Sequence, residues 1–236
     1  MGTAVFLAAG VMAFGDGCLA RSRYERDCLV TEEYRIASEK IHGQGKTIVF
    51  LTDLHKKEFG EENSRLLETV RKVKPDAVLF GGDGMVAKRG NSDVRIPLAL
   101  LTELAKEFPV YCGNGNHECR MVWKSDIYGA AYENYQAALE NAGIRYLANG
   151  SADLDGEIRI YGLDLPKSAY LPRSGQIPEN LLKDALGEPD PGRFNLLLAH
   201  SPLFFEAYAA WGADLTLSGH FHGGPLRLPV LGGVMT

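Results

Sequence analysis

The sequence predicts an α/β protein in which two packed β-sheets are flanked by helices. In the first half, short apolar runs rich in β-branched residues alternate with segments of helical spacing, a pattern typical of parallel strand–helix–strand units. Tight-turn dipeptides appear in the middle of the chain and further apolar strands follow, so the second half is expected to be mixed or antiparallel.

The length and composition are those of one large globular domain, or of one domain with an appendage. Of the 236 residues, 45% are hydrophobic and 23% are charged, which excludes a disordered chain, a coiled coil or a fibrous repeat. The formal net charge is −5, whereas general nucleic-acid binding usually shows a basic excess. Nucleic acid is therefore not an expected partner.

The first half is expected to form a parallel layer. Its strands are nearly all apolar, as in a sheet that is buried on both faces, and its helices repeat their apolar residues on one side. The strands are predicted at Thr47–Thr52, Ala77–Phe80 and Pro109–Cys112, and the helices at Glu61–Val73 and Val94–Glu107.

The middle of the chain predicts two tight hairpins. Asn-Gly and Asp-Gly dipeptides at 149–150 and 155–156 favour the positive φ angles of hairpin turns. These turns would join strands at Arg145–Ala148, Ser151–Leu154 and Glu157–Tyr161.

Two more buried strands are predicted at Phe194–Ala199 and Asp214–Leu217, separated by an aromatic helix at Leu203–Trp211. The helix has two interpretations. Its apolar residues form the core-facing side of an amphipathic helix, or they form an apolar wall for the tail of a lipid-linked substrate. These residues are Leu203, Phe204, Phe205, Tyr208 and Trp211.

The N-terminal arm begins with an apolar run, Thr3–Phe14, and includes a segment, Thr31–Ile36, that alternates enough to be a strand. The apolar run is too short to span a bilayer and lacks the basic start of a signal peptide. It is either a helix or strand packed on the domain or the remainder of a membrane anchor. Arginines at 21, 23 and 26 would in the second case place the rest of the chain in the cytoplasm.

The cysteines do not have the spacing of a zinc finger or a redox pair. Free thiols are expected in a reducing compartment, and a Cys18–Cys28 disulfide is the alternative if the protein is exported. Cys112 and Cys119 lie on either side of a polar cluster, but harder ligands already surround them.

Five of the six histidines lie in short polar clusters, and each cluster begins where a predicted strand ends. The clusters are Asp53–His55, Gly81–Asp83, Asn114–Glu118, His200 and Gly219–Gly223. In open α/β sheets, ligands bind in the crevice beyond the carboxyl ends of the strands, so these side chains are expected to meet in one place.

The residue types in the clusters indicate a transition-metal site. In an extended segment, residues i and i+2 project the same way, so Asp53 and His55 could hold one ion together. Neighbouring glycines allow sharp turns and close approach of the backbone. Carboxylate, imidazole and amide oxygen suit zinc, manganese or iron, whereas a set rich in thiolates would indicate a structural zinc.

The ordered set DLH, GGD, GNHE, a lone His after an apolar strand, and GHxH resembles the calcineurin-like metallophosphoesterases. The resemblance runs from about Thr47 to Gly224, and GHFHGGPLRLPVLGG is similar to the bacterial YkuE-like branch, some of whose members are anchored in membranes. It implies a four-layer sandwich of two mixed sheets flanked by helices. Residues 45–236 would be the catalytic domain, and residues 1–44 the apolar segment and arm.

The resemblance also implies a dinuclear centre of manganese, iron or zinc ions, divalent or trivalent. It assigns the first ion to Asp53, His55 and His222, the second ion to Asn116, His200 and His220, the bridge to Asp83, and the catalytic acid to His117. A hydroxide bridging the two metals would attack a phosphodiester, pyrophosphate or phosphomonoester bond. A dinuclear nuclease and a non-enzymatic metal-binding scaffold of the same fold are the alternatives.

The second motif departs from that of the protein phosphatases of this superfamily. They extend it to GDxxDRG, but here Val86 stands where the second acid would pair with the catalytic histidine. A protein-phosphatase activity is therefore disfavoured, and Glu118 is the candidate partner that would orient His117.

Basic residues follow three of the motifs and have two interpretations, as contacts for substrate phosphates or as solvated loop charges. They are Lys56, Lys57, Lys88, Arg89 and Arg120.

Members of this branch usually continue beyond the last strand-like run. The sequence stops at Gly232–Thr236, so we expect a truncated C-terminus and an uncovered sheet edge. The resemblance implies a bacterial protein, either membrane-associated or cytoplasmic.

Overall fold

The computed structural model describes residues 21, 24, 25, 27–171, 176–222, 226–228 and 232–235. The chain divides into two compact units, Met1–Arg35 and Ile36–Thr236. The apolar run at Thr3–Phe14 lies outside the described residues. In the part of the chain that is described, no helix is both long enough and apolar enough to cross a bilayer.

The strand expected at Thr31–Ile36 is absent, and this prediction was wrong. The segment has no regular secondary structure. Tyr34 is 79% exposed and Ile36 is 53% exposed, so no sheet face buries the residues that alternate in the sequence.

The first sheet has the strand order β1-β2-β3-β4, and every pair is parallel. The strands are β1 (Ile48–Leu51), β2 (Ala77–Phe80), β3 (Val110–Cys112) and β4 (Arg145–Tyr146). The helical segments between these strands are η1 (Glu61–Asn63), α2 (Ser64–Val73), α3 (Arg95–Ala105), α4 (Asn116–Trp123), α5 (Ser125–Tyr128) and α6 (Ala131–Asn141).

The second sheet is mixed, with the order β5-β6-β7-β8. β5 runs antiparallel to β6, while β6, β7 and β8 are parallel. The strands are β5 (Gly150–Asp153), β6 (Ile158–Leu163), β7 (Phe194–Ala199) and β8 (Leu215–Leu217). Its helical segments are η2 (Lys167–Tyr170), α7 (Leu181–Leu186), η3 (Pro202–Phe204) and α8 (Phe205–Trp211). Near the end of the chain, β9 (Leu226–Leu228) and β10 (Gly232–Met235) form an antiparallel pair.

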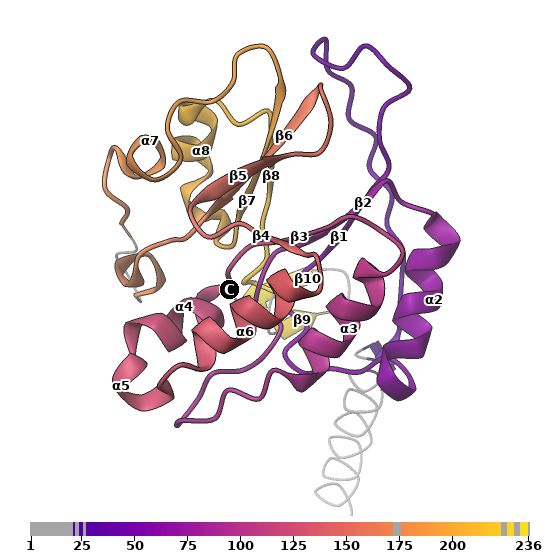
Figure 1. Cartoon of the computed structure of the whole chain (residues 1–236), viewed down its shortest axis with the longest axis vertical. Coiled ribbons are helices and arrows are strands. Elements are labelled where there is room, and N and C mark those ends of the chain that lie inside the picture. The colour runs from indigo at the N-terminus through magenta and orange to yellow at the C-terminus, as the bar shows by residue number, and fades with distance from the viewer. Residues whose placement is uncertain are drawn as a thin grey trace, which may run out of the picture. The chain divides into compact units, whose positions relative to one another are not determined.

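The predicted architecture of two sheets flanked by helices is confirmed (Figure 1). One core lies between the sheets, where Leu79 and Tyr111 of the first sheet pack with Ile160 and Leu196 of the second. A second core lies between the second sheet and helices α7 and α8. On the other face of the first sheet, α2, α3 and α6 bury leucines against the remaining strand residues. The order of layers is therefore helices, sheet, sheet, helices.

Only one of the two hairpins that the sequence predicts is formed. β5 and β6 pair as expected, and Asp155 Oδ1 accepts the N–H groups of Glu157 and Ile158 in the connecting turn. β4 and β5 do not pair, because β4 joins β3 in the first sheet. Asn149, with φ of 52°, instead turns the chain from one sheet to the other.

The aromatic helix packs mainly into the protein. Tyr208 is fully buried, and its hydroxyl donates a hydrogen bond to Ser201 O at 2.8 Å. Phe204 and Trp211 pack against the same core. Leu203 and Phe205 remain 61% and 64% exposed, so the helix has both a buried side and an apolar exposed end.

We expect Leu79→Ala to lower the free energy of unfolding by about 3 kcal/mol, because it removes a fully buried side chain from the layer between the sheets. Urea denaturation should show a lower midpoint with an unchanged slope. Leu203→Ala, at an exposed position, is the matched control and should shift the stability by less than about 0.5 kcal/mol. Equal effects of the two substitutions would contradict this description of the core.

Candidate metal centre

All eight residues proposed as ligands or acid follow the carboxyl ends of strands in the two sheets. The first sheet provides Asp53 and His55 after β1, Asp83 after β2, and Asn116 and His117 after β3. The second provides His200 after β7 and His220 and His222 after β8. Parallel strands end at one edge of a sheet, so the topology explains why residues far apart in sequence converge.

The ligand-bearing loops turn through left-handed backbone conformations. φ is 54° at Asp53, 46° at His55, 54° at Asp83, 74° at His220 and 51° at His222. The segment from Asp53 to His55 is therefore not extended as expected, but the two side chains still meet in one candidate ligand group. The backbone instead leaves the strand sharply, and the His55 N–H donates to Asp83 O at 3.0 Å. Such conformations are sparsely populated by residues other than glycine, and they concentrate at functional sites.

Two glycines allow the loops to approach one another closely. A Cβ atom on Gly82, whose φ is 89°, would lie 2.0 Å from the backbone nitrogen of Gly115. A Cβ atom on Gly219 would lie 2.1 Å from Asp53 Oδ2. The absence of a side chain at these positions lets the loops after β2 and β3 touch, and lets the loop after β8 approach Asp53.

Asp53, His55 and His222 form the first candidate ligand group. The Nε2 atoms of the two histidines lie 2.9 Å apart, and His222 Nε2 lies 3.2 Å from Asp53 Oδ1. His55 Nε2 lies 3.6 Å from the same oxygen. Two imidazole nitrogens and a carboxylate oxygen that converge in this way suit a divalent transition metal.

Asp83, His200 and His220 form the second candidate ligand group. His200 Nε2 lies 3.2 Å from Asp83 Oδ2. His220 Nδ1 lies 2.8 Å from the amide oxygen of Asn116, so Asn116 faces the same group.

The ring of His200 has the orientation of a metal ligand. Its Nδ1 lies 2.8 Å from Gly81 O, which is a hydrogen bond that leaves the lone pair on Nε2. Nε2 is buried and has no hydrogen-bond partner in the described part of the chain. A buried lone pair that faces the carboxylates of Asp83 and Asp53 is repelled by them unless a cation lies between, so this atom fits a metal ion.

The pKa values of Asp83 and His200 also indicate a site for positive charge. Burial alone would raise its pKa, but the neighbouring imidazole of His200 outweighs burial and holds the pKa at about 2. Burial alone would lower the pKa of His200, but the carboxylates of Asp83 and Asp53 raise it to about 9. The pocket therefore favours positive charge between the carboxylates.

Glu118 ties the loops after β2 and β3 together. Its Oε2 accepts the N–H groups of Asp83 at 2.8 Å and Gly115 at 3.0 Å, and its Oε1 accepts the N–H of Gly84 at 3.0 Å. Burial, followed by the charge of Asp83, raises its pKa to about 7. Because both oxygens bind backbone, Glu118 supports the Asp83 loop. The hydrogen bonds found for it do not include the expected one to His117.

His117 is instead oriented by the loop after β2. Its Nδ1 accepts the N–H of Ala87 at 3.0 Å, and its ring meets that of His55 edge to face at 5.3 Å. Burial lowers the pKa of His117. Because Nδ1 accepts a hydrogen bond, the proton of the neutral ring lies on Nε2. His117 also forms a third candidate ligand group with His55 and Asp83, so its geometry alone is compatible with metal binding.

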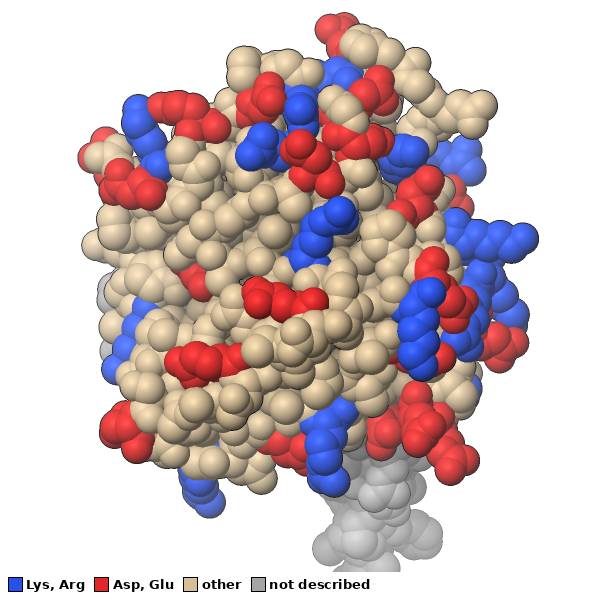
Figure 2. Space-filling view, viewed as in Figure 1, with Lys and Arg blue, Asp and Glu red and all other residues tan. Residues whose placement is uncertain are grey.

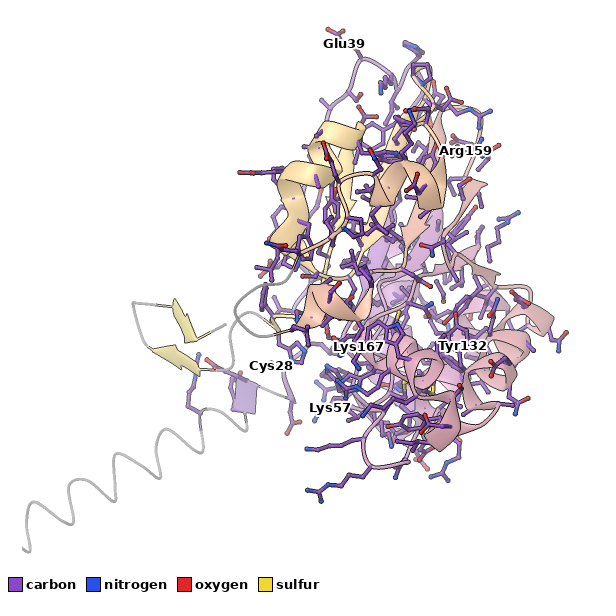
Figure 3. The ribbon with its side chains drawn as sticks, turned by 90° about the vertical axis from the view of Figure 1, so that its left-hand side faces the viewer. Cys28, Glu39, Lys57, Tyr132, Arg159 and Lys167 are labelled. Carbon is purple, nitrogen blue, oxygen red and sulfur yellow. The ribbon has the colours of Figure 1, made fainter. Side chains whose placement is uncertain are left out.

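The sequence analysis did not predict the polar network around Asn114, which lies two residues before Asn116. Asn114 Nδ2 donates to both carboxylate oxygens of Asp164 at 3.0 Å and to the hydroxyl of Tyr132, which is labelled in Figure 3. Tyr146 donates to Asn114 Oδ1. Burial raises the pKa of Asp164 to about 6. Asp164 lies one residue past β6, so its position at a strand end was the signal that could have revealed it.

The three cysteines in the described ranges are not members of the candidate ligand groups. Cys28, Cys112 and Cys119 are free thiols. Burial raises the pKa of Cys112 and Cys119, so both are neutral thiols rather than soft thiolate ligands. Cys18 lies outside the described residues.

Residues 46–224 match the calcineurin-like phosphoesterase family. The chain is 29% identical to the uncharacterized metallophosphoesterase YkuE of Bacillus subtilis, in an alignment that covers 98% of this chain and 77% of that protein. It is 30% identical to the phosphodiesterase YaeI of Escherichia coli, covering 84% of this chain and 68% of that protein. It is 28% identical to an uncharacterized metallophosphoesterase of Aquifex aeolicus, with 88% and 75% covered.

We expect Glu118→Gln to lower the free energy of unfolding by about 2 kcal/mol, because an amide has one acceptor oxygen and leaves a buried N–H unpaired. Loosening the Asp83 loop should also weaken Mn²⁺ binding about 10-fold to 100-fold in calorimetric titrations of the metal-free protein.

The matched control is Glu133→Gln on the exposed side of α6, which should change neither quantity. Unchanged stability and Mn²⁺ affinity in Glu118→Gln would show that Glu118 does not support the Asp83 loop.

Proposed function

This chain belongs to the calcineurin-like phosphoesterase family, and we propose that it cleaves a phosphodiester or pyrophosphate linkage at a dinuclear metal centre. Membership of the family makes it a metal-dependent hydrolase of phosphate esters. The linkage, the number of metal ions and the roles of single residues are our proposal. Phosphomonoesters are expected to be slower substrates of the same site.

The observation that carries this proposal is the position of Asp83 between two ligand groups. Its Oδ2 lies 3.2 Å from His200 Nε2 in the second group and 3.8 Å from His55 Nε2 in the first. A carboxylate that faces both groups is suited to bridge two cations. The relative from Escherichia coli is named a phosphodiesterase, which supports a diester rather than a monoester as the preferred substrate.

We assign the first ion to Asp53, His55 and His222 and the second to Asn116, His200 and His220, with Asp83 shared. When bound, two such ions supply Lewis-acid stabilisation of the phosphoryl oxygens and a water of lowered pKa. Asp53 is held in place by the N–H of His220, which donates to its Oδ2 at 3.0 Å, and by Thr52 Oγ1, which donates to the same oxygen at 3.0 Å.

His117 is the residue we assign to proton transfer. The Ala87 N–H fixes its tautomer so that Nε2 carries a proton, which can be donated to the oxygen that leaves phosphorus. Arg120 donates to Ala87 O at 2.9 Å and so holds the segment that orients His117. This arrangement replaces the acid–histidine pair that the GDxxDRG motif would provide.

Removal of metal tests the proposed centre. We expect EDTA-treated protein to lose turnover of bis-p-nitrophenyl phosphate and to regain it with Mn, Zn, Fe or Co, with about two ions bound per chain. Metal content and turnover are measured on the same samples. Full activity at one ion per chain would contradict the dinuclear centre, and two bound ions without turnover of any diester or pyrophosphate would contradict the proposed reaction.

His117→Ala should lower kcat for bis-p-nitrophenyl phosphate about 10²-fold to 10⁴-fold while the metal content stays unchanged, because it removes a proton donor and no ligand. His42→Ala, at an exposed position remote in sequence from the motifs, is the matched control and should retain full turnover. If His117→Ala loses metal, the third candidate ligand group is the correct interpretation and His117 is a ligand.

A further inference from the structure

A pocket of about 340 Å³ is lined by the loop after β2, the C-terminal part of α4, and η2. Its volume lies in the range of sites that take small organic ligands. Ten residues line the pocket, of which five are lysine or arginine and none is acidic. The cationic residues are Lys88, Arg89, Arg120, Lys124 and Lys167, the last of which is labelled in Figure 3.

The charge of this pocket departs from that of the protein as a whole. The chain carries 30 acidic and 25 basic side chains, and on the face shown in Figure 2 the two signs are interspersed. Within the described ranges, no ion pair joins any of the five cationic residues to an acid, whereas Arg71, Arg95 and Arg193 each have at least one. Like charges gathered without counter-charges attract an anion.

The pocket adjoins the metal centre through residues that contact both. Tyr170 lines the pocket, and its ring meets that of His220 edge to face at 5.2 Å. Ala87 also lines it and donates the hydrogen bond that orients His117. A substrate whose reacting phosphate lies between the ligand groups could therefore place another part of itself in the pocket.

The remaining walls are aromatic. Trp123 and Tyr170 lie 5.9 Å apart between ring centroids, with their planes tilted by 43°, and Tyr128 lines the same pocket. Aromatic faces of this kind provide apolar contact area for an organic group. A pocket lined by both cations and aromatic rings suits an organic phosphate better than a free inorganic ion.

We propose that this pocket binds a second phosphate group of the substrate, so that the substrate is an organic molecule with at least two phosphates. This inference rests on the proposed function of the adjoining site. From the sequence, the basic residues that follow the motifs had two interpretations, as substrate contacts or as solvated loop charges. The structure separates them: Lys88, Arg89 and Arg120 line the pocket, while Lys56 donates a hydrogen bond to Asn91 outside it.

Two nucleotide diesters that differ only by one phosphate test the proposal. The probes are thymidine 5′-(p-nitrophenyl phosphate) and the same compound with a 3′-phosphate. For the metal-loaded wild type, we expect the 3′-phosphate to raise kcat/KM about tenfold, through charge-assisted hydrogen bonds to the pocket. In Lys124→Gln/Lys167→Gln, this ratio should fall to near one, because two exposed cations of the pocket are removed.

The matched control is Lys74→Gln/Lys106→Gln, which makes the same change of net charge at exposed positions outside the pocket. It should keep the wild-type ratio. An equal ratio in the wild type, the pocket variant and the control would overturn the proposal, as would equal losses in the two variants, which would indicate a general effect of charge.

Equilibrium binding separates this proposal from the proposed reaction. Thymidine 3′,5′-bisphosphate should bind the wild type more tightly than thymidine 5′-monophosphate, and the pocket variant should lose that preference. This result supports the pocket even if no diester is hydrolysed. Turnover of both diesters without any preference for the bisphosphate would overturn the pocket and leave the reaction standing.

Vesicles test the other source of the same headgroup chemistry. Wild type and pocket variant are sedimented with vesicles of phosphatidylglycerol and phosphatidylcholine. If the substitutions abolish vesicle binding and leave the preference for the soluble bisphosphate unchanged, the cations serve a membrane surface and the proposal is wrong. Loss of the soluble preference with unchanged sedimentation supports it.

Discussion

Two carboxylates in a pocket with little access to water determine the architecture of the site. Asp53 and Asp83 both face the Nε2 atom of His200, at 3.7 and 3.2 Å, and the three side chains are almost inaccessible to solvent. Two carboxylates that face the same buried atom destabilise each other unless positive charge lies between them. This repulsion explains why the pKa of His200 is raised. It also explains why the buried Nε2 atom, which has no hydrogen-bond partner in the described residues, faces the carboxylates. A metal ion between the carboxylates would supply that charge, and the imidazoles and amide oxygen around them are its candidate ligands.

The fold satisfies this constraint by rigid support rather than by long flexible loops. Each ligand lies within a few residues of a buried strand, and the loops are fixed by backbone hydrogen bonds such as those that Glu118 accepts. Left-handed backbone conformations occur at five of the candidate ligands, where the chain turns sharply away from each strand. The strain is tolerated because the two cores on either side of the second sheet hold the strand ends in place.

The strands and the polar clusters that follow them were predictable from the sequence, because strand periodicity and motif order are properties of local sequence. The runs that became β1, β2, β3 and β7 are short, apolar and followed at once by polar clusters. Other features depend on tertiary contacts. Asn149 closes a hairpin if β4 pairs with β5, and carries the chain to another sheet if β4 pairs with β3, as it does here. The local sequence around Asn149 does not indicate which strand β4 joins. Helices α4 and α6 were not expected, because α4 is made of the polar cluster itself and α6 buries only Tyr135 and Leu139. The grouping of cations around one pocket likewise needs η2 to meet α4, which the sequence does not show.

The first and second candidate ligand groups each draw on both sheets. The first combines Asp53 and His55 from the end of β1 with His222 beyond β8, and the second combines Asp83 beyond β2 with His200 and His220. A cation in either group is therefore a cross-link between the two halves of the sandwich, and it closes a loop of more than a hundred residues. Cross-links that close long loops restrict the unfolded chain, and the metal binds only where the sheets already meet. Metal binding at the candidate centre and the packing of the sheets would thus form one thermodynamic unit, and the affinity for the ion would report on the integrity of the fold.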